Sequence, residues 1–156
     1  MRKTIDEIRE IVNKLVKKAG TRDAFKLAKY LDIKILFLPL GDVKDGFWVQ
    51  DGREMRIVIN EDLSLDRQRL VCAHELGHAI MHREVGGALM QSYTRLSVAR
   101  YEIEANFFAF DLEFRNLDES ERIDDVLERY ALKREEIKLM YEYLEGQRKM
   151  DDYHTW

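Results

Sequence analysis

The stretch from Val71 to His82 constrains the fold of this chain most strongly. It reads Val-Cys-Ala-His-Glu-Leu-Gly-His-Ala-Ile-Met-His, with His74 and His78 four residues apart. On a helix, residues at i and i+4 lie one turn apart on the same face, so both imidazoles can bind a single metal ion. Glu75 is rotated by about 100° from His74. That rotation places Glu75 beside such an ion, where it can hold and deprotonate a water molecule.

The sequence around this motif favours a helix. Residues 66–72 contain neither glycine nor proline, and either Ser64 or Asp62 can cap the first turn. Gly77 is the one weak helix former, and such a glycine often marks the close approach of another backbone or a substrate. The alternative is a chance match in which two histidines merely pack. A third ligand elsewhere in the chain would favour the metal site.

Length and composition indicate one soluble domain. The 156 residues suit a single core. We expect a domain over residues 1–150, with a helical C-terminal subregion at 117–150 and a tail at 151–156. The net charge of −4 predicts no bulk attraction to nucleic acid or to an anionic membrane. Cys72 is the single cysteine, so no internal disulfide can form, and we expect it to be a small buried residue. The start of the chain is amphipathic and does not resemble a secretion signal, which predicts a cytoplasmic location.

Two helices are predicted at the N-terminus. Residues 4–19 carry an apolar stripe with a capping-box pair, Thr4 and Glu7, and Gly20 as the C-cap. A second, shorter helix is predicted over residues 21–31. Lysines and arginines make this region somewhat basic, so a DNA-binding helix pair is an alternative. The solvated face of two packed helices is the preferred interpretation.

A small sheet is predicted directly before the histidine helix. Residues 33–38 are rich in β-branched and aromatic residues and end at Pro39. Residues 47–50 and 55–60 read as a hairpin around an Asp51-Gly52 turn. The nearly continuous apolar run at residues 57–59 is typical of a strand covered on both faces. We expect a mostly antiparallel sheet of three or more strands. An edge strand of it would suit backbone pairing with a substrate chain, and several strands are candidates for that edge.

The third ligand is sought in the next helix, after a loop predicted over residues 83–97. Helical pattern resumes at residues 98–114, where Glu102, Ala105, Asn106 and Ala109 share one face while the phenylalanines are expected to point elsewhere. Small residues let two helices approach closely, which would bring Glu102 to the two histidines. Glu104 lies about 200° away on the wheel, so only one of the two glutamates can reach the ion. In the alternative interpretation both glutamates are surface charge.

His82 continues the His74 and His78 series by one more turn. A third histidine on one straight helix lies too far along the axis to share the same ion. We therefore expect His82 to support the ligands from behind or to be structural. Tyr93, Arg100 and Tyr101 are nearby donors for an oxyanion, and the sequence selects none of them.

The C-terminal third predicts two helices, over residues 118–130 and 133–147. Acidic residues outnumber basic ones by ten to seven between residues 117 and 150. This balance argues against direct contact with DNA. A helical pair that docks a protein substrate or closes the core is the preferred interpretation.

Taken together, these residues resemble the ImmA/IrrE-type zinc metallopeptidases of bacteria and their mobile elements. The matching parts are His-Glu-Leu-Gly-His at residues 74–78 with His82 after it, and Glu-x-Glu-Ala-Asn at residues 102–106 with Phe-Ala at 108–109. The resemblance covers about residues 21–114. It implies one zinc ion held by His74, His78 and Glu102, with Glu75 as the catalytic base. It also implies a substrate, because members of this family cleave helix-turn-helix repressors.

The expected fold is therefore α+β: N-terminal helices, a small sheet, a zincin-like histidine helix, the Glu102 helix and a C-terminal helical pair. The expected function is a zinc-dependent endopeptidase that cleaves a specific helix-turn-helix repressor and so derepresses mobile-element or stress genes. The alternative is a metal-binding anti-repressor that sequesters its repressor without cutting it. Glu75 favours the enzyme, because a purely structural zinc site has no use for a base and normally fills its fourth position with protein.

Overall fold

The computed structural model describes residues 2–84, 95–117 and 121–154. The chain begins with α1 (Ile5–Ala19), whose predicted ends are confirmed. The Thr4 hydroxyl accepts a hydrogen bond from the backbone N–H of Glu7, and the Glu7 carboxylate accepts one from the backbone N–H of Thr4. Gly20 ends the helix with a left-handed φ of 73°. The second helix, α2 (Ala24–Tyr30), is shorter than expected, because the Asp23 side chain caps it three residues into the predicted span.

Three strands form the sheet: β1 (Ile33–Leu38), β2 (Gly46–Asp51) and β3 (Glu54–Asn60), in the order β1-β3-β2. β2 and β3 are the expected antiparallel hairpin, but β1 pairs with β3 in parallel. The sheet is therefore mixed rather than mostly antiparallel. β3 takes the central position because its Ile57, Val58 and Ile59 are all buried, as the apolar run predicted.

The side chain of Asn60 explains how the chain reaches this topology. Residues 39–45 must cross the end of β3 to pass from β1 to β2. The Asn60 amide donates to the backbone carbonyls of Gly41 and Lys44 at 2.8 and 3.3 Å, and its oxygen accepts from the N–H of Leu40 at 3.3 Å. Asn60 is 3% exposed. One buried amide therefore holds the crossover loop in place.

The hairpin turn lies one residue further along than predicted. Asp51 pairs with Glu54 in the ladder, so the two turn residues are Gly52 and Arg53 rather than Asp51 and Gly52. Gly52 has a φ of 61°, a left-handed value that glycine adopts without strain. The glycine therefore occupies the first of the two turn positions.

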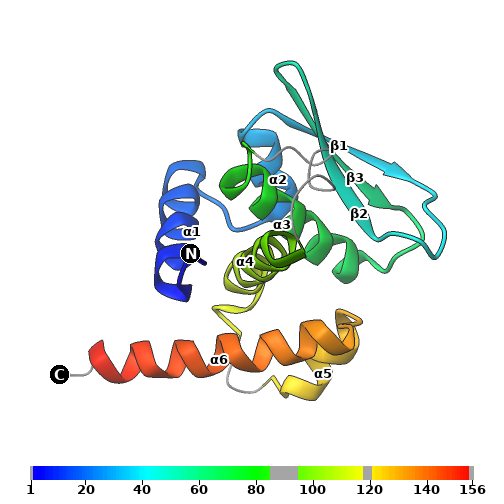
Figure 1. The fold of residues 1–156 in the computed structure, drawn as a ribbon. Coiled ribbons are helices and arrows are strands. Elements are labelled where there is room, and N and C mark those ends of the chain that lie inside the picture. The colour runs from blue at the N-terminus through cyan, green and yellow to red at the C-terminus, as the bar shows by residue number, and fades with distance from the viewer. Residues whose placement is uncertain (1, 85–94, 118–120, 155–156) are drawn as a thin grey trace.

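The next two helices form the centre of the molecule (Figure 1). α3 (Leu65–Met81) is capped by Ser64, whose hydroxyl accepts from the N–H of Arg67. α4 (Arg95–Phe114) begins three residues before the predicted start. Much of the loop predicted over residues 83–97 lies outside the described residues. α3 lies between the sheet and α4, so the histidine helix is supported on two sides.

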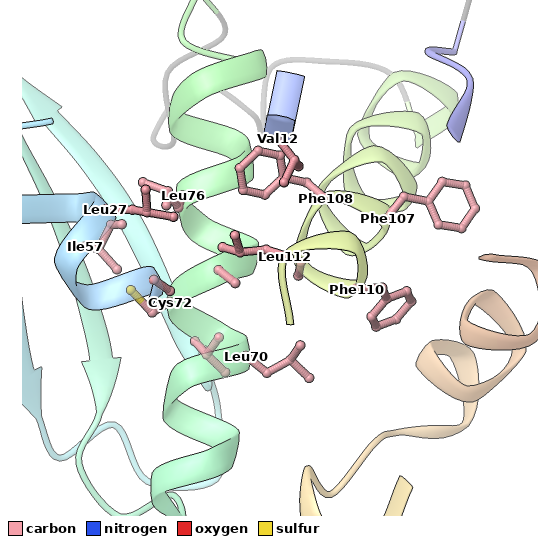
Figure 2. Close-up of a cluster of buried hydrophobic side chains, with 14 of the residues drawn as sticks. Val12, Leu27, Ile57, Leu70, Cys72, Leu76, Phe107, Phe108, Phe110 and Leu112 are labelled. Carbon is pink, nitrogen blue, oxygen red and sulfur yellow. The ribbon is translucent and has the colours of Figure 1, made fainter. Parts of the chain in front are cut away.

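α3 and α4 approach each other closely at Gly77. A Cβ built on Gly77 would lie 3.1 Å from three atoms of the Phe108 side chain. The expectation that the phenylalanines of α4 point away from this contact is therefore wrong for Phe108, as Figure 2 shows. Ala105 and Ala109 are fully buried as small residues in the helix packing. The glycine makes room for an aromatic ring, which the pattern of small residues alone did not predict.

The C-terminal helices are α5 (Ile123–Arg129) and α6 (Arg134–His154). α5 begins at Ile123, later than the predicted start at residue 118, because its N-cap residue Arg122 has an extended backbone. Residues 118–120 lie outside the description. α6 continues through residues 151–154, so the tail predicted over 151–156 is wrong for those four residues. No proline or glycine follows Gly146 to break the helix.

α6 packs against α4, and one cluster of buried hydrophobic residues runs from α1 to α6. The Tyr143 hydroxyl donates to a carboxylate oxygen of Asp111 at 2.8 Å and joins the two helices. The predicted α+β class, with helices before and after the strands in the sequence, is confirmed. Among the described helices, none combines the length and the apolar character that a membrane crossing requires.

Candidate metal centre

α3 places His74 and His78 on one face, as their spacing predicted. Their rings lie edge to face, with centroids 4.8 Å apart. The His78 side chain is 3% exposed, and that of His74 is 18% exposed. The two imidazoles therefore sit at the boundary between the core and an open cavity.

α4 brings Glu102 across to both histidines. Its Oε2 lies 3.1 Å from His74 Nε2, and its Oε1 lies 3.0 Å from His78 Nε2. One atom from each of the three side chains falls within a span of 4.8 Å. Two imidazole nitrogens and a carboxylate oxygen are a donor set that catalytic zinc sites use, and such sites leave a fourth position open. These side chains therefore fit a zinc ion.

Asn106 holds His74 from its other side. Its Oδ1 lies 3.2 Å from His74 Nδ1, and its amide nitrogen donates to the backbone carbonyl of Glu102 at 3.1 Å. A proton on His74 Nδ1 would be donated to Asn106, which directs Nε2 toward Glu102. Asn106 was placed on the Glu102 face by helical spacing, but sequence reasoning gave it no role. Its place in the motif was the available signal.

His74 and Glu102 shift each other's pKa. Burial alone would lower the pKa of His74, but the hydrogen bond and negative charge of Glu102 outweigh it and raise that pKa to about 9. Burial would raise the pKa of Glu102, yet its hydrogen bonds with His74 and His78 hold that pKa well below the usual range.

Glu75 lies beside this cluster. It is 8% exposed, and burial raises its pKa above the ordinary value for a glutamate, against the lowering effect of His74 and His78. Glu75 lines the same cavity as His74, His78 and Glu102. A carboxylate with an elevated pKa next to a candidate metal position has the character of a general base.

The cavity has a volume of about 400 Å³, and its wall comes from the β1–β2 loop, β2, α3, α4 and the chain around the start of α6. β2 supplies Gly46, Phe47 and Trp48, while α3 and α4 supply the histidine and glutamate cluster. The far end carries the charged residues Lys44, Asp45, Arg67, Lys133 and Glu136.

Arg67 is the buried centre of that charged end. Its guanidinium lies 2.7 Å from Asp45 Oδ2 and 3.0 Å from Glu136 Oε1. Lys133 also contacts Asp45 at 2.9 Å. These ion pairs join the β1–β2 loop, α3 and the start of α6 around the cavity. Nothing in the local sequence pattern indicated them, because their partners are distant along the chain.

Among the remaining predicted residues, His82 lies directly next to the cluster. His82 is 2% exposed and contacts His78, so it is not placed at the Glu102 oxygens. Burial, together with the nearby His78, lowers the pKa of His82 to about 3. Tyr101 packs against His82 with ring centroids 4.5 Å apart, and Arg100 lies over the Tyr101 ring. Tyr93 lies outside the described residues. Cys72 is fully buried, and burial raises the pKa of its thiol.

Comparison with known proteins agrees with these motifs. The model of the IrrE N-terminal-like domain matches residues 28–142, well over half of the chain. Over 105 residues, 67% of the chain, the sequence is 39% identical to the uncharacterized immunity region protein 2 of Bacillus phage phi105. It is 27% identical over 105 residues, again 67% of the chain, to the metallopeptidase ImmA of Bacillus subtilis strain 168. The matches span 66% and 62% of those two relatives, just under two thirds of their lengths. The chain therefore belongs to the ImmA/IrrE-type metallopeptidase family, through its IrrE N-terminal-like domain.

Proposed function

We propose that this chain is a zinc-dependent endopeptidase whose single zinc ion is held by His74, His78 and Glu102. The observation that carries the proposal is the bridging position of Glu102, whose two oxygens each meet an Nε2 atom of α3. A structural zinc site would normally close its fourth position with protein. Here the cluster opens into a cavity with the buried Glu75 beside it. That arrangement suits hydrolysis.

A bound zinc ion would supply Lewis acidity for the scissile carbonyl and would lower the pKa of the attacking water toward neutrality. The protein's own residues do the remaining work. Glu75 accepts a proton from the water and delivers it to the leaving amine. Asn106 keeps His74 in the orientation that presents Nε2 to the site.

β2 is the edge strand best placed to hold an extended substrate. It pairs with β3 on one side only in the described sheet, and its first three residues line the cavity. An extended peptide can add to such an edge by backbone hydrogen bonds, with alternate side chains directed into the cavity. We propose that the substrate backbone runs along β2 past the metal centre.

The proposed substrate is a helix-turn-helix repressor, whose cleavage would derepress mobile-element or stress genes. The family resemblance supports this assignment. The phi105 relative, which is named for an immunity region, is consistent with it. The proposed partner is thus a protein, with no direct nucleic-acid contact, and the proposed location is the cytoplasm.

Incubation of the zinc-loaded chain with a candidate helix-turn-helix repressor, chosen from the genes that neighbour its own, tests the proposal. Glu75→Gln removes the base while leaving the three ligands in place, so it should bind the repressor and leave it intact. Glu113→Gln is the matched control, because it makes the same change at a partly buried glutamate that does not line the cavity. Cleavage by the native chain and by Glu113→Gln, but not by Glu75→Gln, supports the peptidase. Binding without cleavage by all three would instead support a sequestering anti-repressor.

A further inference from the structure

A buried pair, His82 and Glu104, lies directly behind His78. His82 Nδ1 is 2.9 Å from His78 Nδ1, and His82 Nε2 is 3.5 Å from Glu104 Oε1. Both residues are 2% exposed, and neither belongs to the described wall of the cavity. A carboxylate this deeply buried is costly unless it has a specific partner. The position of the His82–Glu104 pair behind a candidate metal ligand indicates the role of the pair.

The hydrogen-bond chain has one consistent arrangement of protons if His78 holds a metal. Its Nε2 faces Glu102 and is the ligand atom, so the neutral ring carries its proton on Nδ1. That proton is donated to His82 Nδ1. His82 then carries its own proton on Nε2 and donates it to the Glu104 carboxylate. Each donor in the series thus meets an acceptor.

We propose that His82 and Glu104 are positioning residues that fix the tautomer and ring orientation of His78 and thereby strengthen metal binding. This inference rests on the proposed function, since it takes His78 as a ligand. A metal-bound histidine usually donates its second N–H to a carboxylate, a backbone carbonyl or water. Here the carboxylate acts through an intervening imidazole, which explains why the third histidine follows the motif at the same spacing.

The surroundings of Glu104 support a dedicated role. Its Oε2 has no hydrogen-bond partner among the described residues. Lys3 Nζ lies 3.9 Å from Oε1, but its side chain is 40% exposed, so it offers a weak, solvated ion pair. His82 is the buried contact of Oε1. A carboxylate with one oxygen buried and unpaired adds little to the fold, so its presence fits a task at the metal centre.

Zinc affinity of the full chain, measured by competition with a chromophoric chelator, tests the pair. His82→Phe keeps a ring but removes the acceptor, and we expect zinc binding to weaken by roughly 10-fold to 100-fold. His82→Asn places an amide oxygen near the position of Nδ1 and should recover most of that loss. Glu104→Gln should weaken binding roughly 10-fold. Because Glu104 acts through His82, the double variant His82→Phe/Glu104→Gln should bind no more weakly than His82→Phe alone.

Asp111→Asn is the matched control. Asp111 is another buried carboxylate on α4, but it bonds to Tyr143 and Arg115 rather than to a histidine. Urea unfolding of every metal-free variant is measured alongside. The inference holds if Asp111→Asn lowers stability without changing zinc affinity, while the His82 and Glu104 variants change affinity in the stated order. It is overturned if native protein binds zinc tightly and His82→Phe and Glu104→Gln bind it equally well, or if affinity simply follows stability across all variants. Failure of the native protein to bind zinc overturns the proposed function, and this inference with it.

Discussion

Replacement of Gly77 by alanine tests how closely α3 and α4 must pack to assemble the site. The new Cβ would lie 3.1 Å from the Cβ, Cγ and Cδ1 atoms of Phe108. The Phe108 Cβ is fixed to the α4 backbone, so rotation of the ring cannot relieve the contact. Overpacking of this kind typically costs about 1–3 kcal/mol. Alanine regains up to about 1 kcal/mol of helix propensity. With the full regain, the middle of that range gives an expected net loss of about 1 kcal/mol in the free energy of unfolding.

Gly146→Ala is the matched control for this prediction. Its Cβ would meet the Cδ1 atom of Ile5 at 2.7 Å, which is the far end of a flexible side chain. Rotation of Ile5 relieves that contact, so the gain in helix propensity should leave Gly146→Ala as stable as the native protein or more so. Urea unfolding at 25 °C measures both variants. The packing argument is refuted if Gly77→Ala is at least as stable as the native protein.

Two further perturbations test the electrostatics away from the metal centre. Arg67→Met removes the buried cation of Glu136 and leaves Asp45 with Lys133 as its charged partner. The loss should be about 3 kcal/mol of unfolding free energy, toward the low end for buried pairs, because Lys133 remains and both carboxylates keep some solvent contact. An unchanged urea midpoint would contradict this. Burial raises the pKa of Glu113 from 4.5 to about 7, so the folded state favours the protonated carboxyl. The unfolding free energy of the native protein minus that of Glu113→Gln should therefore be greatest below pH 4.5 and should fall as the pH rises through 7, by at most about 3 kcal/mol. Urea unfolding from pH 4 to pH 8 measures this difference, and a difference that does not change with pH would disprove the assignment.

Local signals predicted much of this structure. Thr4 with Glu7, Gly20 and Ser64 each cap a helix through contacts within a few residues, so their sequence pattern contains the needed information. The spacing of His74 and His78, and the shared face of Glu102 and Asn106, depend only on helix geometry. That geometry correctly predicted which side chains would meet, because two rigid helices present them.

The parts that sequence reasoning missed depend on contacts between distant segments. The parallel pairing of β1 with β3 needs a crossover loop, which Asn60 holds by hydrogen bonds, and no local pattern indicates those bonds. The position of Phe108 follows from a glycine on another helix. Arg67 finds its partners in the β1–β2 loop and in α6.

Glu104 shows the same difficulty at the site itself. A helical wheel places it about 200° from Glu102 and therefore excludes it from the ion. The wheel does not show that the opposite direction leads to a buried histidine one turn beyond the motif. The signal was present in the third histidine, but its partner could be identified only from the packing of α3 against α4.

X-ray absorption at the zinc edge of the zinc-loaded chain tests the central claim most directly. If His74, His78 and Glu102 hold one zinc ion per chain, the spectrum should show nitrogen and oxygen ligands at about 2.0–2.2 Å. It should also show outer-shell scattering from two imidazoles. Cys72, the single cysteine, belongs to the buried hydrophobic core and should contribute no sulfur. A sulfur ligand at about 2.3 Å, or a spectrum without imidazole scattering, would contradict the account.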